Sequence, residues 1–447
     1  MKKPKLHFTP TKNWMNDPNG FIYYKGEYHL FYQHFPYATS WGTMHWGHKT
    51  SKDLVHWKDL GIAMYPSKGF DRNGCFSGSA IEVDDKMYLY YTAIVYDTLN
   101  EENIHVSGNG LIASQAMMIS EDGYTFNPDT KRVVIPTFKE GQIGDLANTR
   151  DPKVWKENDQ YYMVVGSQYF NQELHKKMGE VLVYTSKDAL NWTYQNRIIE
   201  PKLDSNMWEC PDLFALDGRY ALIMSPENTI KDGINYPSHA LISWVDFNNQ
   251  TCEGKLVSTP TFLDYGLDLY APQTTIDKDG NRVVIAWLRM PQPSEDGSWN
   301  GVFIYPRIIK AKGDHFYFQI HPNVDKLFVK EVEQFTNQEP VKISCDLEEE
   351  SKLDIGGYKI TLIDNQVVVD RKDVFVTKAN LFNTDSQAGT TFKTPKLKDG
   401  NHVDIYVDDQ VIEVYVNNGE YVLSNIVYYL KDEFECENVD NLKIYQI

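Results

Sequence analysis

Residues 14–20 read Trp14-Met15-Asn16-Asp17-Pro18-Asn19-Gly20 and stand directly before an apolar run at 21–24 that has the pattern of a short strand. Pro18 fixes its own φ angle and donates no backbone hydrogen bond, and asparagine and glycine favour tight turns. The carboxylate of Asp17 is therefore expected in a shaped turn beside an aromatic residue. Taken alone, the stretch also fits an ordinary turn, so a role for Asp17 as a nucleophile depends on the rest of the chain.

The same arrangement recurs five times: a short polar motif, a strand, a turn and a second strand. The motifs are Asp17-Pro18-Asn19-Gly20, Phe76-Ser77-Gly78-Ser79, Arg150-Asp151-Pro152, Glu209-Cys210-Pro211-Asp212 and Tyr270-Ala271-Pro272-Gln273. Each unit spans about 60 residues and has room for four strands, which predicts an all-β fold, a five-bladed β-propeller. If each motif begins the innermost strand of its blade, all five meet at one end of the central channel. A sandwich of irregular hairpins is the alternative, but it needs no such long period.

Three of these units carry a further marker, in which a serine and an aspartate precede an aromatic residue. The segments are 51–57, 120–126 and 186–192, which end in Trp57, Phe126 and Trp192. We interpret each as a turn pinned by the aspartate, followed by an aromatic side chain that packs between sheets.

The composition changes after the fifth unit. Residues 289–307 are predicted to form a proline-rich loop and a closing strand, and residues 325–334 a short amphipathic linker helix. From residue 340 onward, short alternating runs between glycine and asparagine turns predict an all-β domain, most simply a β-sandwich. The predicted organisation is therefore a propeller at 1–322, a linker at 323–339 and a C-terminal β-sandwich at 340–447.

Charge and cysteine usage exclude several classes of function. The 447-residue chain carries a net charge of −18, which argues against nucleic-acid partners and anionic membranes. Its five cysteines are odd in number and far apart, which argues against a disulfide framework or a zinc site. The first residues lack an apolar signal-peptide core, and no run approaches the length of a membrane span. We therefore expect a cytoplasmic protein, and this surface is compatible with a monomer or a homodimer.

The propeller brings Asp17, Asp151 and Glu209 to one mouth of the channel. Three carboxylates in an aromatic-rich chain, without a histidine or cysteine partner, suggest glycoside hydrolysis. A retaining hydrolase needs a carboxylate nucleophile and a carboxylic acid about 5–5.5 Å apart. Glu209 lies between Trp208 and Cys210, a poorly solvating setting that suits the acid/base, and Asp17 suits the nucleophile.

The third carboxylate, Asp151, follows Arg150 in the sequence. Because an adjacent arginine can hold a carboxylate ionised, Asp151 is suited to support the transition state. Cys210 offers an alternative nucleophile, but no histidine is placed to activate it. His45 and His48 have the i, i+3 spacing of a metal pair on a helix. Because no helix is expected there, a packed, hydrogen-bonded pair is the better interpretation.

These motifs, in this order and at these spacings, resemble glycoside hydrolase family 32, the invertases and fructanases. The resemblance extends through Phe31-Tyr32-Gln33, Trp41-Gly42 and His45-Trp46-Gly47-His48, and reaches residues 411–419. It implies a five-bladed β-propeller followed by a C-terminal β-sandwich. It also implies retaining hydrolysis of terminal β-D-fructofuranosides through a covalent fructosyl-enzyme intermediate, without a metal or a cofactor.

The resemblance assigns roles to individual residues. It makes Asp17 the nucleophile, Glu209 the acid/base and Asp151 the transition-state stabiliser. The residues that it implies as substrate contacts are Trp14, Asn16, Gln33, Trp41, Phe76, Ser77 and Arg150, with Trp14 and Phe76 lining the fructosyl site. One departure from the family pattern is Lys12-Asn13, where a glycine commonly precedes the aromatic residue, and we expect a local difference in the turn there.

Within the family, the chain most resembles the members that act on sucrose 6-phosphate. Two features carry this resemblance: the expected cytoplasmic location and the motif Asn73-Gly74-Cys75-Phe76-Ser77-Gly78-Ser79. The expected small-molecule substrate is therefore sucrose 6-phosphate or sucrose. Three alternatives stay open: an exo-fructanase acting on inulin or levan, a fructosyltransferase, and a non-catalytic carbohydrate-binding propeller. The presence of all three carboxylates argues against the last.

Overall fold

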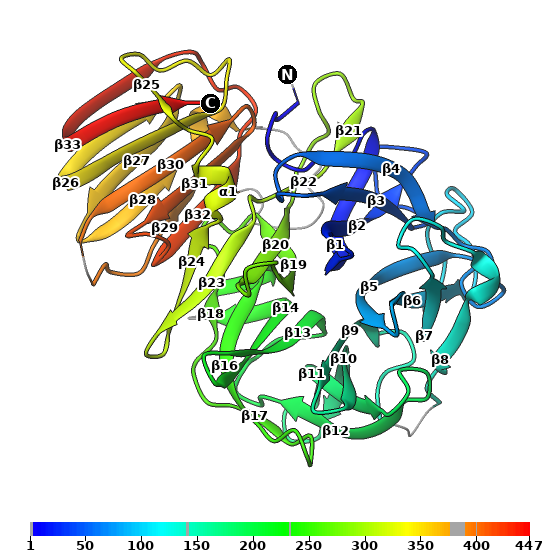
Figure 1. Ribbon diagram of the computed structural model, residues 1–447. Helices are drawn as coiled ribbons and strands as arrows, with labels where there is room; N and C mark the ends of the chain where they lie inside the picture. The colour runs from blue at the N-terminus through cyan, green and yellow to red at the C-terminus, as the bar shows by residue number, and fades with distance from the viewer. Residues whose placement is uncertain (1–2, 140–142, 232–233, 376–388, 399) are drawn as a thin grey trace.

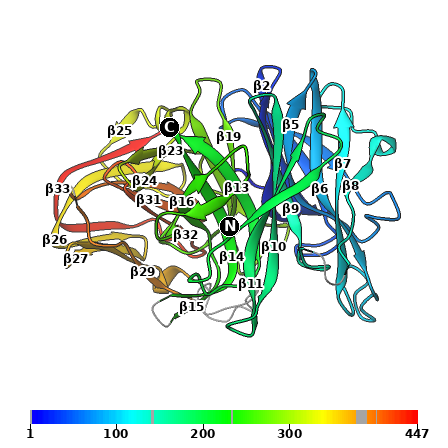
Figure 2. The ribbon, with the colours of Figure 1, turned by 90° about the horizontal axis from the view of Figure 1, so that it is seen from below.

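The computed structural model describes residues 3–139, 143–231, 234–375, 389–398 and 400–447. Five small antiparallel sheets surround a central channel, and a second β domain lies beside the ring (Figure 1). Seen at a right angle to that view, the second domain packs against the side of the ring (Figure 2). The predicted fold class, a five-bladed propeller followed by a β-sandwich, is confirmed. Within the described ranges, no helix combines the length and the apolar character needed to cross a membrane.

The innermost strand of every blade carries one of the five polar motifs. These strands are β1 (Asn13–Tyr24), β5 (Gly74–Val83), β9 (Arg150–Glu157), β13 (Trp208–Leu216) and β19 (Leu269–Ile276). They stand around the centre of the ring in Figure 1. The repeat seen in the sequence is therefore the blade repeat.

The remaining strands complete the blades by pairing outward from these five. Blade I adds β2 (Glu27–Phe35), β3 (His45–Ser51) and β4 (Trp57–Met64). Blade II adds β6 (Lys86–Tyr96), β7 (Leu111–Ser120) and β8 (Arg132–Ile135), with the 3-10 turn η1 (Pro128–Thr130) before β8. Blade III adds β10 (Gln160–Asn171), β11 (Lys176–Ser186) and β12 (Thr193–Ile199).

The last two blades carry short extra strands. Blade IV adds β14 (Arg219–Lys231), β16 (Leu241–Phe247) and β17 (Gly254–Leu256), with β15 (Ile234–Ser238) on β14 and β18 (Thr261–Phe262) on β16. Blade V adds β20 (Arg282–Leu288), β23 (Arg307–Lys312) and β24 (His315–Ile320), with β22 (Val302–Phe303) on β20. The proline-rich loop also supplies β21 (Trp299–Asn300), which pairs in parallel with the start of β1 and links the last part of the ring to the first.

Each polar motif coincides with a break in the strand register. In blades I, II, IV and V the pairing shifts within the motif, for example between Glu209 and Asp212 of β13, and in blade III it shifts opposite Arg150. Such bulges re-aim side chains and are frequent beside active sites. Asp151, Cys210 and Ala271 adopt φ angles of 69°, 47° and 51°, a left-handed conformation that ordinary residues rarely occupy. The motifs thus leave regular strand geometry at the channel mouth.

Side chains from one inner strand bond to the backbone of the next. Gln273 of blade V accepts from the Phe21 amide at 2.8 Å in blade I and donates to the Gly78 carbonyl at 2.9 Å in blade II. A Cβ on Gly78 would come within 1.9 Å of the Tyr90 carbonyl oxygen, so this position requires glycine. These bonds fix the inner strands relative to one another across the channel.

The three predicted serine–aspartate turns have the expected form. Asp53, Asp122 and Asp188 each accept hydrogen bonds from the serine before them and from backbone amides after them. The aromatic residue that follows then packs on a neighbour, as Trp192 does edge-to-face against Tyr90 of the adjacent blade. Asn13, one of the two residues at the departure from the family pattern, adopts a positive φ of 65°, a conformation that glycine tolerates easily.

The C-terminal domain is built around two long strands that run through both of its layers. At one end β26 (Val341–Ile355) pairs with β30 (His402–Asp408), and at the other end it pairs with β27 (Tyr358–Ile363). On its other side, β26 pairs with β33 (Phe434–Gln446) at both ends. The other strands are β25 (Lys330–Val332), β28 (Gln366–Asp370), β29 (Thr391–Lys393), β31 (Val411–Val416) and β32 (Tyr421–Ile426), with the 3-10 turn η2 (Lys372–Val374).

The predicted linker helix at 325–334 is wrong. The helix α1 (Pro322–Asp325) is a single turn capped by His321, and it ends where the prediction begins. The apolar residues Leu327 and Phe328 pack on the propeller core from an irregular segment, and β25 then pairs with β33. Burial of these side chains, rather than a helical period, explains the apolar spacing that suggested a helix.

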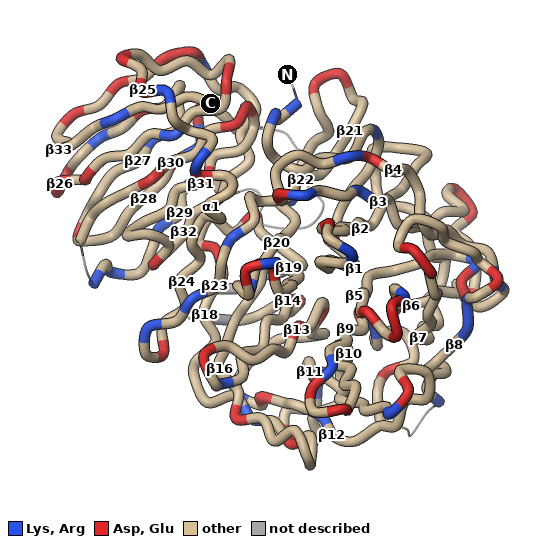
Figure 3. Tube along the Cα trace, in the orientation of Figure 1, with Lys and Arg blue, Asp and Glu red and all other residues tan. Residues whose placement is uncertain are grey.

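A continuous core and a buried ionic network join the two domains. Tyr406, Tyr415 and Ile426 of the sandwich belong to the same core cluster as the strands of blade V. At its centre, the Arg307 guanidinium pairs with Asp264 at 2.9 Å and Glu413 at 2.7 Å, all three side chains being almost fully buried. On the surface, acidic and basic residues are interspersed along the outer loops of both domains (Figure 3).

Candidate active site

The three predicted carboxylates meet at one end of the channel, although they come from three blades. Asp17 comes from β1, Asp151 from β9 and Glu209 from β13. Cys210 links them: its Sγ lies 3.6 Å from Oδ2 of Asp17 and 3.6 Å from Oδ2 of Asp151. Because Cys210 directly follows Glu209, all three acids belong to one cluster.

Asp17 is held by two donors in addition to the thiol. The Ser77 hydroxyl of blade II donates to its Oδ2 at 2.6 Å, and the Asn16 amide donates to its Oδ1 at 3.1 Å. Asn16 in turn accepts from the Trp14 indole at 2.7 Å, so an aromatic residue orients the amide that contacts the carboxylate. Burial raises the pKa of Asp17 to about 6, against the lowering effect of these hydrogen bonds.

Asp151 lies deeper and is positioned mainly by backbone contacts. Its Oδ2 accepts from the Cys210 amide at 2.9 Å, and its own amide donates to Thr92 Oγ1 at 2.9 Å. Burial raises the pKa of Asp151 to about 7, although the charge of Arg150 opposes that rise. The left-handed backbone at Asp151 and at Cys210 is what brings the carboxylate and the amide together.

Arg150 lowers the pKa of Asp151 through its charge, as the sequence suggested, but its hydrogen bonds go to other residues. Its Nη2 lies 2.8 Å from Glu209 Oε1 and 3.2 Å from Glu227 Oε1, and its Nε donates to Glu209 at 2.9 Å. The residue that it holds by hydrogen bonds is therefore Glu209. Tyr270 donates its hydroxyl to the other oxygen of Glu209, so both carboxylate oxygens are engaged.

Cys210 is unsuited to nucleophilic attack. Burial and the adjacent carboxylates raise the pKa of its thiol well above the ordinary value. A protonated thiol can donate weakly to both aspartates, which is the contact that its two 3.6 Å distances describe. All five cysteines of the chain are free.

Three further residues predicted as substrate contacts, Gln33, Trp41 and Phe76, pack on or bond to residues other than the three acids. Trp41 and Phe76 pack edge-to-face with ring centroids 5.6 Å apart, and both are partly exposed. Gln33 is buried and donates to the Cys75 carbonyl at 3.0 Å. In the part of the chain that the structure describes, no hydrogen bond joins Gln33 or Trp41 to the three carboxylates.

The two histidines that the sequence paired are packed with other partners. His48 Nε2 lies 3.1 Å from His29 Nδ1, and the His48 ring stacks on Phe31 at 4.1 Å. His45 Nδ1 bonds to the Thr43 carbonyl at 2.9 Å instead. Burial lowers the pKa of His45 to about 4. Both histidines are thus neutral side chains of the blade core.

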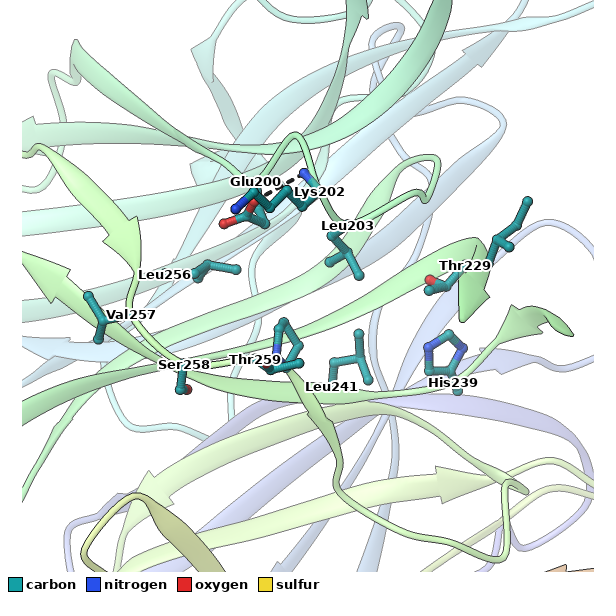
Figure 4. A pocket seen from close by; sticks show the side chains of 12 residues that line it. Glu200, Lys202, Leu203, Thr229, His239, Leu241, Leu256, Val257, Ser258 and Thr259 are labelled. Carbon is teal, nitrogen blue, oxygen red and sulfur yellow. Dashed lines mark hydrogen bonds between the residues drawn. The ribbon is translucent and has the colours of Figure 1, made fainter. Parts of the chain in front are cut away.

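Below the acids, the channel narrows to a cavity of about 10 Å³, which is room for roughly one water molecule. Ser77, Asp151 and Cys210 form its upper wall, and Lys153 and Asp212 are among its other lining residues. A larger pocket of about 460 Å³ lies elsewhere, on blade IV, where Glu200 and Lys202 stand at one end and Thr229 and His239 at another (Figure 4). It contains none of the predicted site residues.

Comparison with known families accounts for nearly the whole chain. The model of the glycosyl hydrolases family 32 N-terminal domain matches residues 7–322, and that of the family 32 C-terminal domain matches residues 332–445. The chain belongs to glycosyl hydrolase family 32.

Relatives within family 32 share most of the length of the chain. It is 32% identical over 443 residues to a sucrose-6-phosphate hydrolase of Bacillus subtilis, covering 94% of this chain and 87% of the relative. It is 30% identical to a sucrose-6-phosphate hydrolase of Escherichia coli, covering 97% and 90%. Among solved structures, a family 32 beta-fructofuranosidase of Bombyx mori superposes with a TM-score of 0.81 at 28% identity, covering 100% of this chain and 94% of that one.

The sequence did not identify three members of this family 32 site as contacts of the acids. Tyr270 was part of the fifth motif, which signals position but not a bond to Glu209. Thr92 and Glu227 lie on second strands of their blades, outside every motif, and no sequence pattern marks them. Burial raises the pKa of Glu227 to about 7, and its bond to Arg150 places it beside Glu209.

Proposed function

We propose that the chain hydrolyses the terminal β-fructofuranosidic bond of sucrose 6-phosphate or of sucrose, with retention of configuration. The observation that carries the proposal is the cluster in which Cys210 contacts Asp17 and Asp151 and directly follows Glu209. A retaining mechanism needs a nucleophilic carboxylate and an acid/base on either side of the scissile bond. The names of the Bacillus subtilis and Escherichia coli relatives support a phosphorylated sucrose as the substrate.

In the first step, Asp17 attacks C2 of the fructosyl unit while Glu209 transfers its proton to the bridging oxygen. The C2–oxygen bond breaks, the glucosyl part leaves as an alcohol, and an ester forms between C2 and Asp17. Ser77 and Asn16 orient the attacking carboxylate through the hydrogen bonds that they donate to it. Trp41 and Phe76 offer partly exposed rings at the mouth on which a sugar can pack.

In the second step, Glu209 takes a proton from water, the water oxygen bonds to C2, and Asp17 leaves as the carboxylate. Arg150 and Tyr270 bond to the charged form of Glu209 that this step requires. Asp151 supports the positive charge that develops on the sugar ring in both steps. We also propose a cytoplasmic location and the domain boundaries at 322 and 340.

The proposal is tested by Asp17→Asn and Glu209→Gln, assayed for fructose release from sucrose and sucrose 6-phosphate. Loss of proton transfer alone removes a factor of about 10²–10⁴, so we expect both variants to fall by at least that much. Matched controls are Asp314→Asn and Glu121→Gln, whose side chains are largely exposed in surface ion pairs. Near wild-type turnover in either site variant would contradict the assigned mechanism.

Two further measurements separate the alternatives. In methanol–water mixtures, a retaining enzyme yields the methyl β-fructofuranoside, and an inverting one yields the α-anomer. Values of kcat/KM for sucrose 6-phosphate, sucrose and inulin rank the substrates. A preference for inulin would replace the phosphorylated-sucrose proposal with an exo-fructanase, and accumulation of fructosyl oligosaccharides would indicate a transferase.

A further inference from the structure

The central channel has a second mouth at the end away from the acids. The inner strands run on past the catalytic cluster, and residues 21–23 of β1 lie roughly 13–20 Å beyond Asp17 at about 3.3 Å per residue. A cavity of about 570 Å³ opens there, lined by residues from all five inner strands. Its lining includes Lys153, Asp212, Phe214, Thr274 and Arg282.

Lys153 and Asp212 form the floor of this cavity and neutralise each other. The Lys153 ammonium lies 3.1 Å from Asp212 Oδ2 and donates to the Thr274 carbonyl at 2.6 Å. Their side chains are 12% and 2% exposed, respectively. The same two residues line the narrow cavity under the catalytic acids, so the two spaces share a common wall.

Arg282 brings a second positive charge to the floor without a carboxylate of its own. Its Nη1 donates to Thr274 Oγ1 at 3.3 Å, and its guanidinium lies 4.8 Å from the centre of the Phe214 ring. Among the residues that the structure describes, none forms an ion pair with Arg282, and none accepts a hydrogen bond from its buried Nε. Burial lowers the pKa of Arg282 and of Lys153, as expected for cations with incomplete compensation.

The acidic residues at the rim do not supply the missing partner. Glu157 accepts from the Tyr220 hydroxyl at 2.7 Å and from Asn249 at 3.1 Å, and Glu82 is exposed to solvent. The floor therefore holds two cations and one carboxylate inside a protein whose net charge is −18. A half-buried guanidinium without an ion pair is well suited to bind an oxyanion, because its planar N–H groups match two oxygens at once.

We propose that the far mouth of the channel is a binding site for a small tetrahedral oxyanion, a phosphate group, held by Arg282 with Lys153 beside it. The site is separate from the catalytic cluster, and its occupancy does not depend on the proposed reaction. The phosphate group can come from inorganic phosphate or from a sugar phosphate. An oxyanion there accepts hydrogen bonds from the Arg282 guanidinium and balances the excess charge on the floor.

The test is calorimetric titration of the full chain with inorganic phosphate and with glucose 6-phosphate, at fixed ionic strength set by sodium chloride. We expect saturable one-site binding of phosphate and a rise in Tm with phosphate that sodium chloride does not reproduce. Arg282→Gln is expected to weaken phosphate binding at least tenfold, and Arg282→Lys to weaken it less. The matched control Arg219→Gln removes an exposed arginine paired with Asp314 and leaves binding unchanged.

Each outcome decides the proposal. If Arg282→Gln loses the binding of both inorganic phosphate and glucose 6-phosphate, the site accepts phosphate esters. If the wild type binds inorganic phosphate alone and the variant loses that binding, the site is one for the free ion. Absence of saturable phosphate binding to the wild type, or binding that Arg282→Gln leaves intact, would overturn it. Hydrolysis of sucrose by Arg282→Gln at the wild-type rate shows that the variant is folded, and Arg282→Lys serves if it is not.

Discussion

At the residue scale, the short bond from the Ser77 hydroxyl to Asp17 has a measurable consequence. A nucleophile must be ionised, so kcat/KM is expected to fall as the pH drops through the pKa of Asp17, which is about 6. Ser77→Ala removes a hydrogen bond to a charged group worth about 1.5–3 kcal/mol, which corresponds to about one to two pH units. The acidic limb of the kcat/KM profile should therefore move upward by that amount.

Ser79→Ala is the matched control for Ser77→Ala. Ser79 lies two residues along the same strand, and its hydroxyl donates to the Pro152 carbonyl at 2.8 Å instead of to a carboxylate. This variant can lower stability, but it should leave the acidic limb in place. An unmoved limb in Ser77→Ala, or an equal shift in Ser79→Ala, would refute the role given to Ser77.

The individual acids could be predicted from sequence because each stands in a motif at the same point of a repeat. In the sequence, Asp17 is more than a hundred residues from both Asp151 and Glu209. The repeat alone nevertheless predicts that all three lie at one mouth of the channel. The partner of Arg150 could not be predicted in this way. Arg150 acts on the adjacent Asp151 through its charge, but its hydrogen bonds reach Glu209 of the next blade, a pairing that only the packing of the blades brings about.

At the element scale, the bulged strand ends offer a test of backbone strain. Ala271 has a φ of 51°, and a left-handed conformation costs an ordinary residue about 1–2 kcal/mol. In Ala271→Gly this relief offsets the loss of a buried methyl group, about 0.8 kcal/mol, and the entropic cost of glycine, about 0.5–1 kcal/mol. We expect the free energy of unfolding to change by less than about 0.8 kcal/mol in either direction.

Ala286→Gly provides the comparison, because Ala286 is fully buried in β20 and its backbone does not have a positive φ. It should cost about 1–2 kcal/mol, since nothing offsets the two losses. Denaturant unfolding of both variants measures the difference. Equal costs at the two positions would show that the bulge at Ala271 stores no strain.

The hairpins and blades followed from apolar alternation and turn residues, which act locally and are written in the sequence. The segment at 325–334 shows where such patterns fail. Leu327 and Phe328 are apolar at a helix-like spacing, but the surface that buries them lies on blade V and the sandwich. Tertiary burial decided the conformation there, and a single-turn helix with an early cap was the outcome.

At the scale of the whole molecule, the two domains are held together by charges that water does not reach. Arg307→Met leaves Asp264 buried without its cation and Glu413 with only His7, 3.0 Å away, which should cost about 3–5 kcal/mol at neutral pH. The Arg307 charge and hydrogen bonds overcome burial and hold the pKa of Glu413 at about 2, so in the wild type its contribution is present above pH 4.5 and is lost toward pH 2.

Without Arg307, the two carboxyls can be protonated at mildly acidic pH, and the loss in Tm should be smaller at pH 5 than at pH 7.5. Thermal unfolding followed by circular dichroism at the two values checks this. Arg219→Met is the control, because its ion pair with Asp314 is exposed and contributes little. A loss of stability that is equal at the two values would exclude the charged network as the cause.

The parallel pairing of β21 with β1 sets an order of events during synthesis. Trp14 leaves the ribosome early, but the residue that pairs with it, Asn300, is made roughly 15–60 s later at about 5–20 residues per second. Until then one edge of the first blade lacks its neighbour, and the acids of the first, third and fourth blades are not enclosed by a complete ring. The start of β1 therefore stays unpaired for most of translation, and the channel mouth is complete only after the residues of the fifth blade have been made.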